Sequence, residues 1–219
     1  MTTAMDAVAG AAYYNRATLL AYDLWVLGIS NRYAWQCPTT TLIEHFNQHL
    51  GARHLDIGVG TGYLLDHCLF PVSNPDIVLA DVNPASLEAA AHRIRHLHPQ
   101  TWLTNVLDAF RIEGAPFDSV SMNYLLHCLP GTFSEKSLAV EHAMAQLKRG
   151  GVLFGATILG DGVTHNALGS MLMRVYNRQG IFSNREDSAD ALQQMLEKHL
   201  KSVQLHIVGR VALFSGKRR

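Results

Sequence analysis

The sequence predicts an α/β fold in which helices cover both faces of a mostly parallel β-sheet. From residue 53 onward, short apolar runs alternate with segments of helical periodicity, which is typical of strands joined by crossover helices. At the end of the chain, the strand-like runs 202–209 and 211–219 are separated by a link too short for a crossover helix. These two runs must therefore be antiparallel, and the sheet is expected to end in one reversed strand.

Each element has its own signal in the sequence. Residues 8–50 are expected to be helical, and the helix over 38–50 begins with Pro38 and a threonine cap. Strands are predicted at 53–57, 77–81, 101–105, 117–122 and 151–158, with helices near 62–69, 84–97, 134–148 and 164–178. We divide the chain into an N-terminal helical lid segment, residues 1–50, and a ligand-binding domain, residues 51–219.

Composition excludes several classes of function. A chain of 219 residues suits one α/β domain, and its 18 basic and 18 acidic side chains cancel, which argues against a nucleic-acid partner. The sequence contains neither a signal-peptide pattern nor a membrane-spanning stretch, so we expect a cytoplasmic protein with no membrane partner. The three cysteines are widely spaced and form no C-x-x-C pair, so we expect neither disulfides nor a thiolate zinc site.

Two histidine pairs have helical i, i+4 spacing, His45 with His49 and His92 with His96. Neither pair contains the glutamate of the H-E-x-x-H zinc motif. We therefore expect them to lie on solvated helix faces, and we expect no metal ion.

The stretch "HLDIGVGTGYLL", residues 54–65, places three glycines between a strand and a helix. It departs from the dinucleotide fingerprint G-x-G-x-x-G, because Tyr63 stands where the third glycine is needed. Asp56 precedes the turn and would repel a diphosphate, but it suits a ligand with an ammonium and a sulfonium group, such as S-adenosylmethionine. The carboxylate of that ligand could use the amides at the start of the following helix. The alternative is a tight turn that binds no ligand.

Two further carboxylates follow strands. Asp81 ends "DIVLAD" and follows the last glycine by roughly the 20 residues expected of a ribose-binding acid. Asp108, in "TNVLDAF", follows the third predicted strand, where it could accept a hydrogen bond from an adenine amino group. The alternative for Asp108 is a solvated loop aspartate.

From about residue 53 to its end, the sequence resembles the class I S-adenosylmethionine-dependent methyltransferases. The motifs "LDIGVGTG", "LADVNPASL", "NVLDAF", "FDSVSMNYLLHCLPG" and "LKRGGVLFGATI" carry the resemblance. It implies a Rossmann-like three-layer sandwich with a seven-stranded sheet, and S-adenosylmethionine as cofactor. It also implies cofactor-binding roles for Asp56, Gly58 and Gly60 at the methionine end, Asp81 and Asn83 at the ribose, and Asp108 at the adenine. Features such as "SNRYAWQCP" and "YNRQGIFSN" look most like small bacterial methyltransferases and fungal ones of secondary metabolism.

The segment "FDSVSMNYLLHCLPG" places polar side chains that could bind ligands or transfer a proton at the carboxyl end of the fourth predicted strand. There we expect Asn123 beside the cofactor, Tyr124 beside the substrate and His127 as candidate general base. His127 could equally pack or form a hydrogen bond beside the cofactor without taking a proton. Residues 123–126 lack the signature of amino-methyltransferases, which disfavours nucleic-acid bases and protein glutamine as acceptors.

Aromatic side chains crowd the first 36 residues, which fits a lid over an aromatic or apolar small molecule. The alternative is ordinary helix packing. The candidate substrate-binding residues here are Tyr13, Tyr14, Tyr22, Trp25 and Trp35. Met171, Met173 and Tyr176 could form a second apolar wall, although such a stripe is more often part of a core.

We therefore expect a methyltransferase that acts on a small-molecule acceptor, aromatic or apolar, by in-line methyl transfer. The alternatives are a cofactor-binding enzyme of this fold that catalyses a rearrangement without methyl transfer, a non-catalytic interaction module and, more distantly, a nicotinamide oxidoreductase. The sequence leaves open the substrate, the acceptor atom and the oligomeric state.

Overall fold

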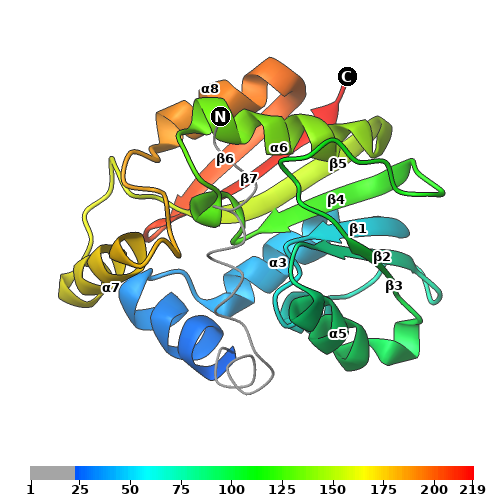
Figure 1. Cartoon of the computed structure of the whole chain (residues 1–219), viewed down its shortest axis with the longest axis horizontal. Helices are drawn as coiled ribbons and strands as arrows, with labels where there is room; N and C mark the ends of the chain where they lie inside the picture. The colour runs from blue at the N-terminus through cyan, green and yellow to red at the C-terminus, as the bar shows by residue number, and fades with distance from the viewer. Residues whose placement is uncertain (1–22) are drawn as a thin grey trace.

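The computed structural model describes residues 23–219, with side chains from Leu27 onward. Within this range seven strands form one sheet in the order β3-β2-β1-β4-β5-β7-β6 (Figure 1). The strands are β1 (Arg53–Ile57), β2 (Asp76–Asp81), β3 (Gln100–Leu103), β4 (Phe117–Asn123), β5 (Leu147–Ile158), β6 (Leu200–Val208) and β7 (Val211–Arg218). Neighbours from β3 to β5 pair in parallel, whereas β7 is antiparallel to both β5 and β6. In this part of the chain β7 is thus the reversed strand, as predicted.

Helices cover both faces of the sheet and complete a three-layer sandwich (Figure 1). The helices are η1 (Asp23–Ala34, a π-helix), α3 (Thr39–His49), α4 (Tyr63–His67), α5 (Pro84–Arg93), η2 (Arg95–Leu97), η3 (Leu126–Cys128), α6 (Phe133–Ala145), α7 (Ala167–Arg178) and α8 (Ala189–His199). Apolar residues of α6 and α8 pack on one face, and those of α3, α4 and α5 pack on the other. Helix α7 packs beside η1. None of the helices in the described range is long and apolar enough to cross a membrane.

The five predicted parallel strands and the terminal hairpin are all present. Helix α8 occupies a stretch for which we predicted no element. Its signal is in the sequence, because Ser188 accepts a hydrogen bond from the Ala191 amide as N-cap, and Leu192, Met195 and Leu196 are buried at helical spacing.

Two local expectations were wrong. Helix α3 begins at Thr39 with Pro38 at the N-cap and has no side-chain cap, because proline has no side-chain acceptor. The Thr39 hydroxyl donates to the Leu27 carbonyl. His45 does not face solvent: its ring is buried, and its Nε2 lies 3.0 Å from the Phe214 carbonyl oxygen. Burial lowers the pKa of His45 to about 4, so it is neutral at physiological pH.

Candidate active site

A cavity opens where the carboxyl ends of β1, β2 and β4 meet, as is general for ligand sites in open α/β sheets. Its wall combines the glycine turn after β1, the ends of β2 and β4, the segment after β3, and residues from η1 and from the segment after α7. The lining residues are Leu27, 56–64, 81–83, Ser86, 104–106, 123–125, Cys128, Leu129 and Ile181.

The three glycines of the turn all have positive φ, a conformation that strains other residues. Gly62 also allows close packing, because a Cβ atom there would lie 2.9 Å from the Cα atom of Ala90 in α5. Gly60 is different, since a Cβ atom there would meet no other atom within 4 Å. The turn thus fixes α5 through Gly62 and leaves the backbone at Gly60 open to a ligand.

Asp56 is buried at the end of β1 and accepts a hydrogen bond from the Ser121 hydroxyl. Burial, with a contribution from nearby Asp81, raises the pKa of Asp56 to about 7. A carboxylate in this position is costly to ionise alone, so a cationic group in the cavity would stabilise it.

Asp81 at the end of β2 is held by backbone amides. The Asn83 N–H donates to its Oδ1 atom over 2.8 Å, and this amide together with the backbone amides of Val59, Val82 and Gly60 opposes the rise in pKa that burial causes. Asn83 lies in the cavity wall, but its side-chain oxygen accepts from the Ala85 amide and caps α5. The Asp81 carboxylate is therefore oriented by the glycine turn itself.

Asn123 ends β4 in the cavity wall, and its Nδ2 atom is buried with no hydrogen-bond partner among the described residues. A buried donor of this kind requires an acceptor, which a bound ligand can supply. Asp108, by contrast, is exposed and does not line the cavity. The Asn105 side chain accepts from the Leu107 amide in a tight turn, which leaves Asn105 and Val106 in the wall where we expected Asp108.

These features fit S-adenosylmethionine, whose ribose hydroxyls need acceptors and whose methionine end carries an ammonium and a sulfonium. One buried carboxylate (Asp56), one partly buried carboxylate (Asp81), one amide donor without a partner among the described residues and an open backbone at Gly60 are present in one cavity.

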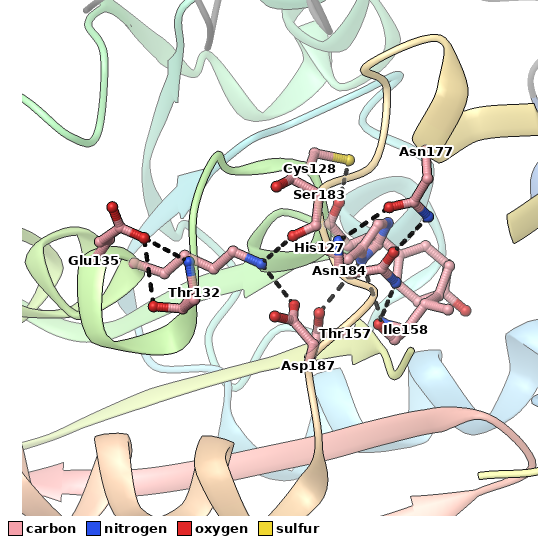
Figure 2. A network of polar contacts seen from close by, with 12 residues as sticks. His127, Cys128, Thr132, Glu135, Thr157, Ile158, Asn177, Ser183, Asn184 and Asp187 are labelled. Carbon is pink, nitrogen blue, oxygen red and sulfur yellow. Dashed lines mark hydrogen bonds and ion pairs between the residues drawn. The ribbon is translucent and has the colours of Figure 1, made fainter. Parts of the chain in front are cut away.

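His127 does not line the cavity and is buried against β5 (Figure 2). Its Nδ1 atom accepts a hydrogen bond of 3.2 Å from the Ile158 amide, and its ring centroid lies 4.5 Å from that of Phe182. Because Nδ1 accepts, the neutral ring carries its proton on Nε2 and has no free lone pair there. Burial lowers the pKa of His127 to about 3. The structure thus favours the packing role over the general-base role.

The aromatic residues predicted for substrate contact in the N-terminal segment divide into two groups. Tyr13, Tyr14 and Tyr22 lie outside the described residues, as does the side chain of Trp25. Trp35 is 1% exposed and packs in a core cluster against Phe182, away from the cavity wall, so the expectation of substrate contact was wrong for it.

Tyr124 does line the cavity, with φ of 55°, and its hydroxyl donates to Asn31 in η1. Leu27 and Ile181 also line it, although we did not predict them. The segment after α7 carries no motif that would have identified Ile181. Met171 is exposed, and Met173 and Tyr176 pack against the core cluster of Trp35.

Three features of this structure are typical of a class of methyl-transferring enzymes. They are the sheet order with a reversed β7, the glycine turn, and the carboxylates at the ends of β1 and β2. Residues 55–153 match the family model described as "Methyltransferase domain". The chain is 42% identical over 205 residues to demethylluteothin O-methyltransferase from Streptomyces thioluteus, covering 94% of this chain and 89% of that protein. It is 40% identical over 207 residues to the physcion biosynthesis cluster O-methyltransferase from Aspergillus chevalieri, covering 94% and 93%.

Among solved structures, the N-methyltransferase NodS from Bradyrhizobium japonicum in complex with S-adenosyl-l-homocysteine has the same fold. The TM-score is 0.59 at 14% identity, and the match covers 92% of this chain and 97% of that one. The chain therefore belongs to the class I S-adenosylmethionine-dependent methyltransferases, and S-adenosylmethionine is its cofactor.

Proposed function

We propose that this enzyme transfers the methyl group to an acidic hydroxyl, a phenol or an enol, of an aromatic or apolar small molecule. The observation that carries this proposal is the composition of the cavity wall. Its polar groups come from the ends of β1, β2 and β4, from the glycine turn and from the segment after β3, whereas Leu27, Leu125, Leu129 and Ile181 supply apolar surface. The two relatives named above are O-methyltransferases, which supports a hydroxyl acceptor.

We assign the polar part of the cavity to the cofactor. Asp56 would face its cationic methionine end, the Asp81 carboxylate would accept from the ribose hydroxyls, and Asn123 would donate through Nδ2. Asn105 and Val106 take the place beside the adenine that we had expected for Asp108. When bound, the cofactor supplies an electrophilic methyl group on a sulfonium.

Methyl transfer from a sulfonium is an in-line displacement in which positive charge disappears, so alignment and exclusion of water supply much of the acceleration. Leu27 in η1, the apolar residues after β4 and Ile181 would exclude water from the acceptor. We propose that residues 23–34 act as part of a lid. The Tyr124 hydroxyl would hold this lid through its hydrogen bond to Asn31.

We propose an acidic acceptor because none of the titratable groups in the described part of the wall is well suited to act as a general base. Burial raises the pKa of the Cys128 thiol to about 12, so this thiol stays protonated at neutral pH. The Tyr124 hydroxyl already donates its hydrogen to Asn31. Tyr63 stacks on His67 with ring centroids 3.9 Å apart, and the two aspartates are assigned to the cofactor. A phenol or enol can ionise without a protein base, whereas an aliphatic alcohol cannot.

The test is incubation of the protein and S-adenosylmethionine, labelled on its methyl group, with matched phenols, aliphatic alcohols, amines and thiols. We expect labelled ether products from the phenols, with a rate that rises with pH through the ionisation of each phenol. Label only in amine or thiol products would refute the hydroxyl assignment. Rearranged products without label would instead support the alternative reaction class.

A further inference from the structure

Four polar side chains lie along one face of β1 and β4, leading to Asp56. In the parallel register His54 lies opposite Ser119, and Asp56 lies opposite Ser121. Alternate residues of a strand point to the same face, so all four side chains share one surface. His54 and Ser121 are 0% exposed, Ser119 is 1% exposed and Asp56 is 6% exposed. Polar groups buried this deeply must satisfy one another.

The four side chains form a continuous hydrogen-bonded chain. The Gly51 amide donates to the Ser119 hydroxyl oxygen over 2.8 Å. Ser119 Oγ lies 2.8 Å from His54 Nδ1, and His54 Nε2 lies 3.0 Å from Ser121 Oγ. The Ser121 hydroxyl then donates to Asp56 Oδ1.

The ionised state of Asp56 fixes the direction of every bond in this chain. A carboxylate can only accept, so the Ser121 hydroxyl must donate to it, and the Ser121 oxygen must accept from His54 Nε2–H. That tautomer leaves Nδ1 as an acceptor, so Ser119 donates to it and accepts from Gly51. Each donor in the chain therefore directs its hydrogen toward the next group on the way to Asp56, and this arrangement stabilises the Asp56 anion.

Aromatic packing fixes the imidazole in this chain. The rings of Phe46 in α3 and Phe154 in β5 lie 5.5 and 5.8 Å from the His54 ring, centroid to centroid. Both phenylalanines are buried. Burial also lowers the pKa of His54 to about 3, which keeps the ring neutral and able to donate at one nitrogen while accepting at the other.

We propose that His54 and Ser121 are positioning residues that hold Asp56 as an anion directed at the cationic end of the cofactor. This inference rests on the proposed placement of Asp56 beside the methionine end. Without the donor at Ser121, the neutral carboxylic acid would be favoured, and it attracts an ammonium or sulfonium much less than the anion does.

The test is calorimetric titration with S-adenosylmethionine between about pH 5.5 and 9, without any acceptor. In the parent protein affinity should rise with pH, because burial raises the pKa of Asp56 to about 7 and the cationic ligand binds the anion. Ser121→Ala should move the midpoint upward by about one pH unit and weaken binding about fivefold at pH 7, approaching about tenfold at lower pH. Near pH 9 the two affinities should converge.

Other titratable groups near Asp56 are the same in every variant. Asp81 faces it from β2, and Cys68 follows α4 with a thiol whose pKa burial raises to about 12. A difference between variants therefore reports the chain from Ser119 to Asp56 alone.

His54→Leu should shift the midpoint in the same direction as Ser121→Ala. His54→Gln should restore it, because an amide can accept from Ser119 and donate to Ser121. Ser215→Ala on β7 removes another buried serine hydroxyl and should leave the pH profile unchanged.

The inference is overturned if folded Ser121→Ala and His54→Leu keep the parent midpoint. It is also overturned if they weaken binding equally at every pH, which would be a purely structural effect. Because no acceptor is present, absence of phenol methylation would refute the proposed function without affecting this result.

Discussion

Tyr124 donates its hydroxyl hydrogen to Asn31 Oδ1 over 2.8 Å and so joins the end of β4 to helix η1. Asn31 is fully buried, and its amide also donates to the Thr39 hydroxyl at the start of α3. Tyr124 has a positive φ, which is uncommon for residues other than glycine and is often found at functional sites. The side of the cavity that we assign to the acceptor is thus built by residues far apart in the sequence.

Tyr124→Phe should raise KM for the acceptor by roughly fivefold and leave cofactor affinity within about threefold of the parent value. A typical hydrogen bond contributes about 1 kcal/mol, and this one holds η1 over the acceptor side only. Steady-state kinetics with varied acceptor, together with cofactor titration, would measure both effects. Tyr33→Phe is the matched control, because Tyr33 is 58% exposed. An equal loss of affinity for acceptor and cofactor would contradict the lid role of η1.

Asp81→Ala should weaken binding of S-adenosylmethionine by about tenfold to several hundredfold, because each hydrogen bond to a charged group contributes about 1.5–3 kcal/mol. Asp81→Asn should have a smaller effect, since it retains one acceptor. Asp108→Asn is the control, as Asp108 is exposed and outside the cavity wall. Calorimetry on folded variants would decide, and parent-like affinity in Asp81→Ala would show that the ribose assignment is wrong.

The cavity wall that we assign to the cofactor was largely predictable from the sequence, because parallel strands end at one edge of the sheet. Asp56, Asp81 and Asn123 each lie within one residue of the end of a predicted strand, and all three lie in one cavity wall. Asp108 does not, since the turn at Asn105 carries the chain away from the cavity before residue 108. The spacing of residues along a strand is a local property, whereas the path of a loop is not.

The acceptor side depends on tertiary packing that no local pattern encodes. Trp35 looked like a lid residue, yet it belongs to the core, and its carbonyl accepts from the Arg210 amide over 2.8 Å. Removal of residues 1–36 would therefore damage the core as well as any lid. Ile181 reaches the cavity because neighbouring residues are anchored to other elements: the Ser183 amide donates to the His127 carbonyl.

His127→Gln should keep turnover within about threefold of the parent value, with an unchanged pH profile, because His127 is neutral and its Nδ1 is occupied by the Ile158 amide. A base would contribute about 10²–10⁴-fold. Initial rates across the pH range would distinguish the roles. A loss of about a hundredfold in the glutamine variant would restore His127 as the base.

The same substitution should flatten the dependence of stability on pH. Below about pH 6.5 the unfolded chain binds a proton at His127, whereas the folded chain does not until about pH 3. Parent stability should therefore fall as pH falls through that window, and His127→Gln should lose this part of the fall. Urea unfolding at several pH values measures it.

The last prediction concerns the buried ion pair between Lys136 in α6 and Asp187. Lys136 Nζ lies 2.6 Å from Asp187 Oδ2 and 2.7 Å from the Ser183 carbonyl oxygen, and neither side chain of the pair is more than 2% exposed. Figure 2 labels the two acceptor residues, Asp187 and Ser183. Lys136→Met would leave the Asp187 carboxylate buried without its partner. We expect a loss of about 3–5 kcal/mol in the free energy of unfolding.

The double variant Lys136→Met, Asp187→Leu should recover much of that loss, because it removes both charges rather than one. Lys148→Met is the matched control: its pair with Asp118 is 54% exposed on the lysine side, so the change should cost about 0.2–1 kcal/mol. Urea unfolding of all three would test the prediction. If Lys136→Met unfolds at the parent urea concentration, the pair does not anchor the segment that carries Ile181 to the cavity. If Lys136→Met unfolds at a lower urea concentration and the double variant unfolds at a concentration nearer that of the parent, the KM for the acceptor should be highest in Lys136→Met and nearer the parent value in the double variant. Cofactor affinity should change little.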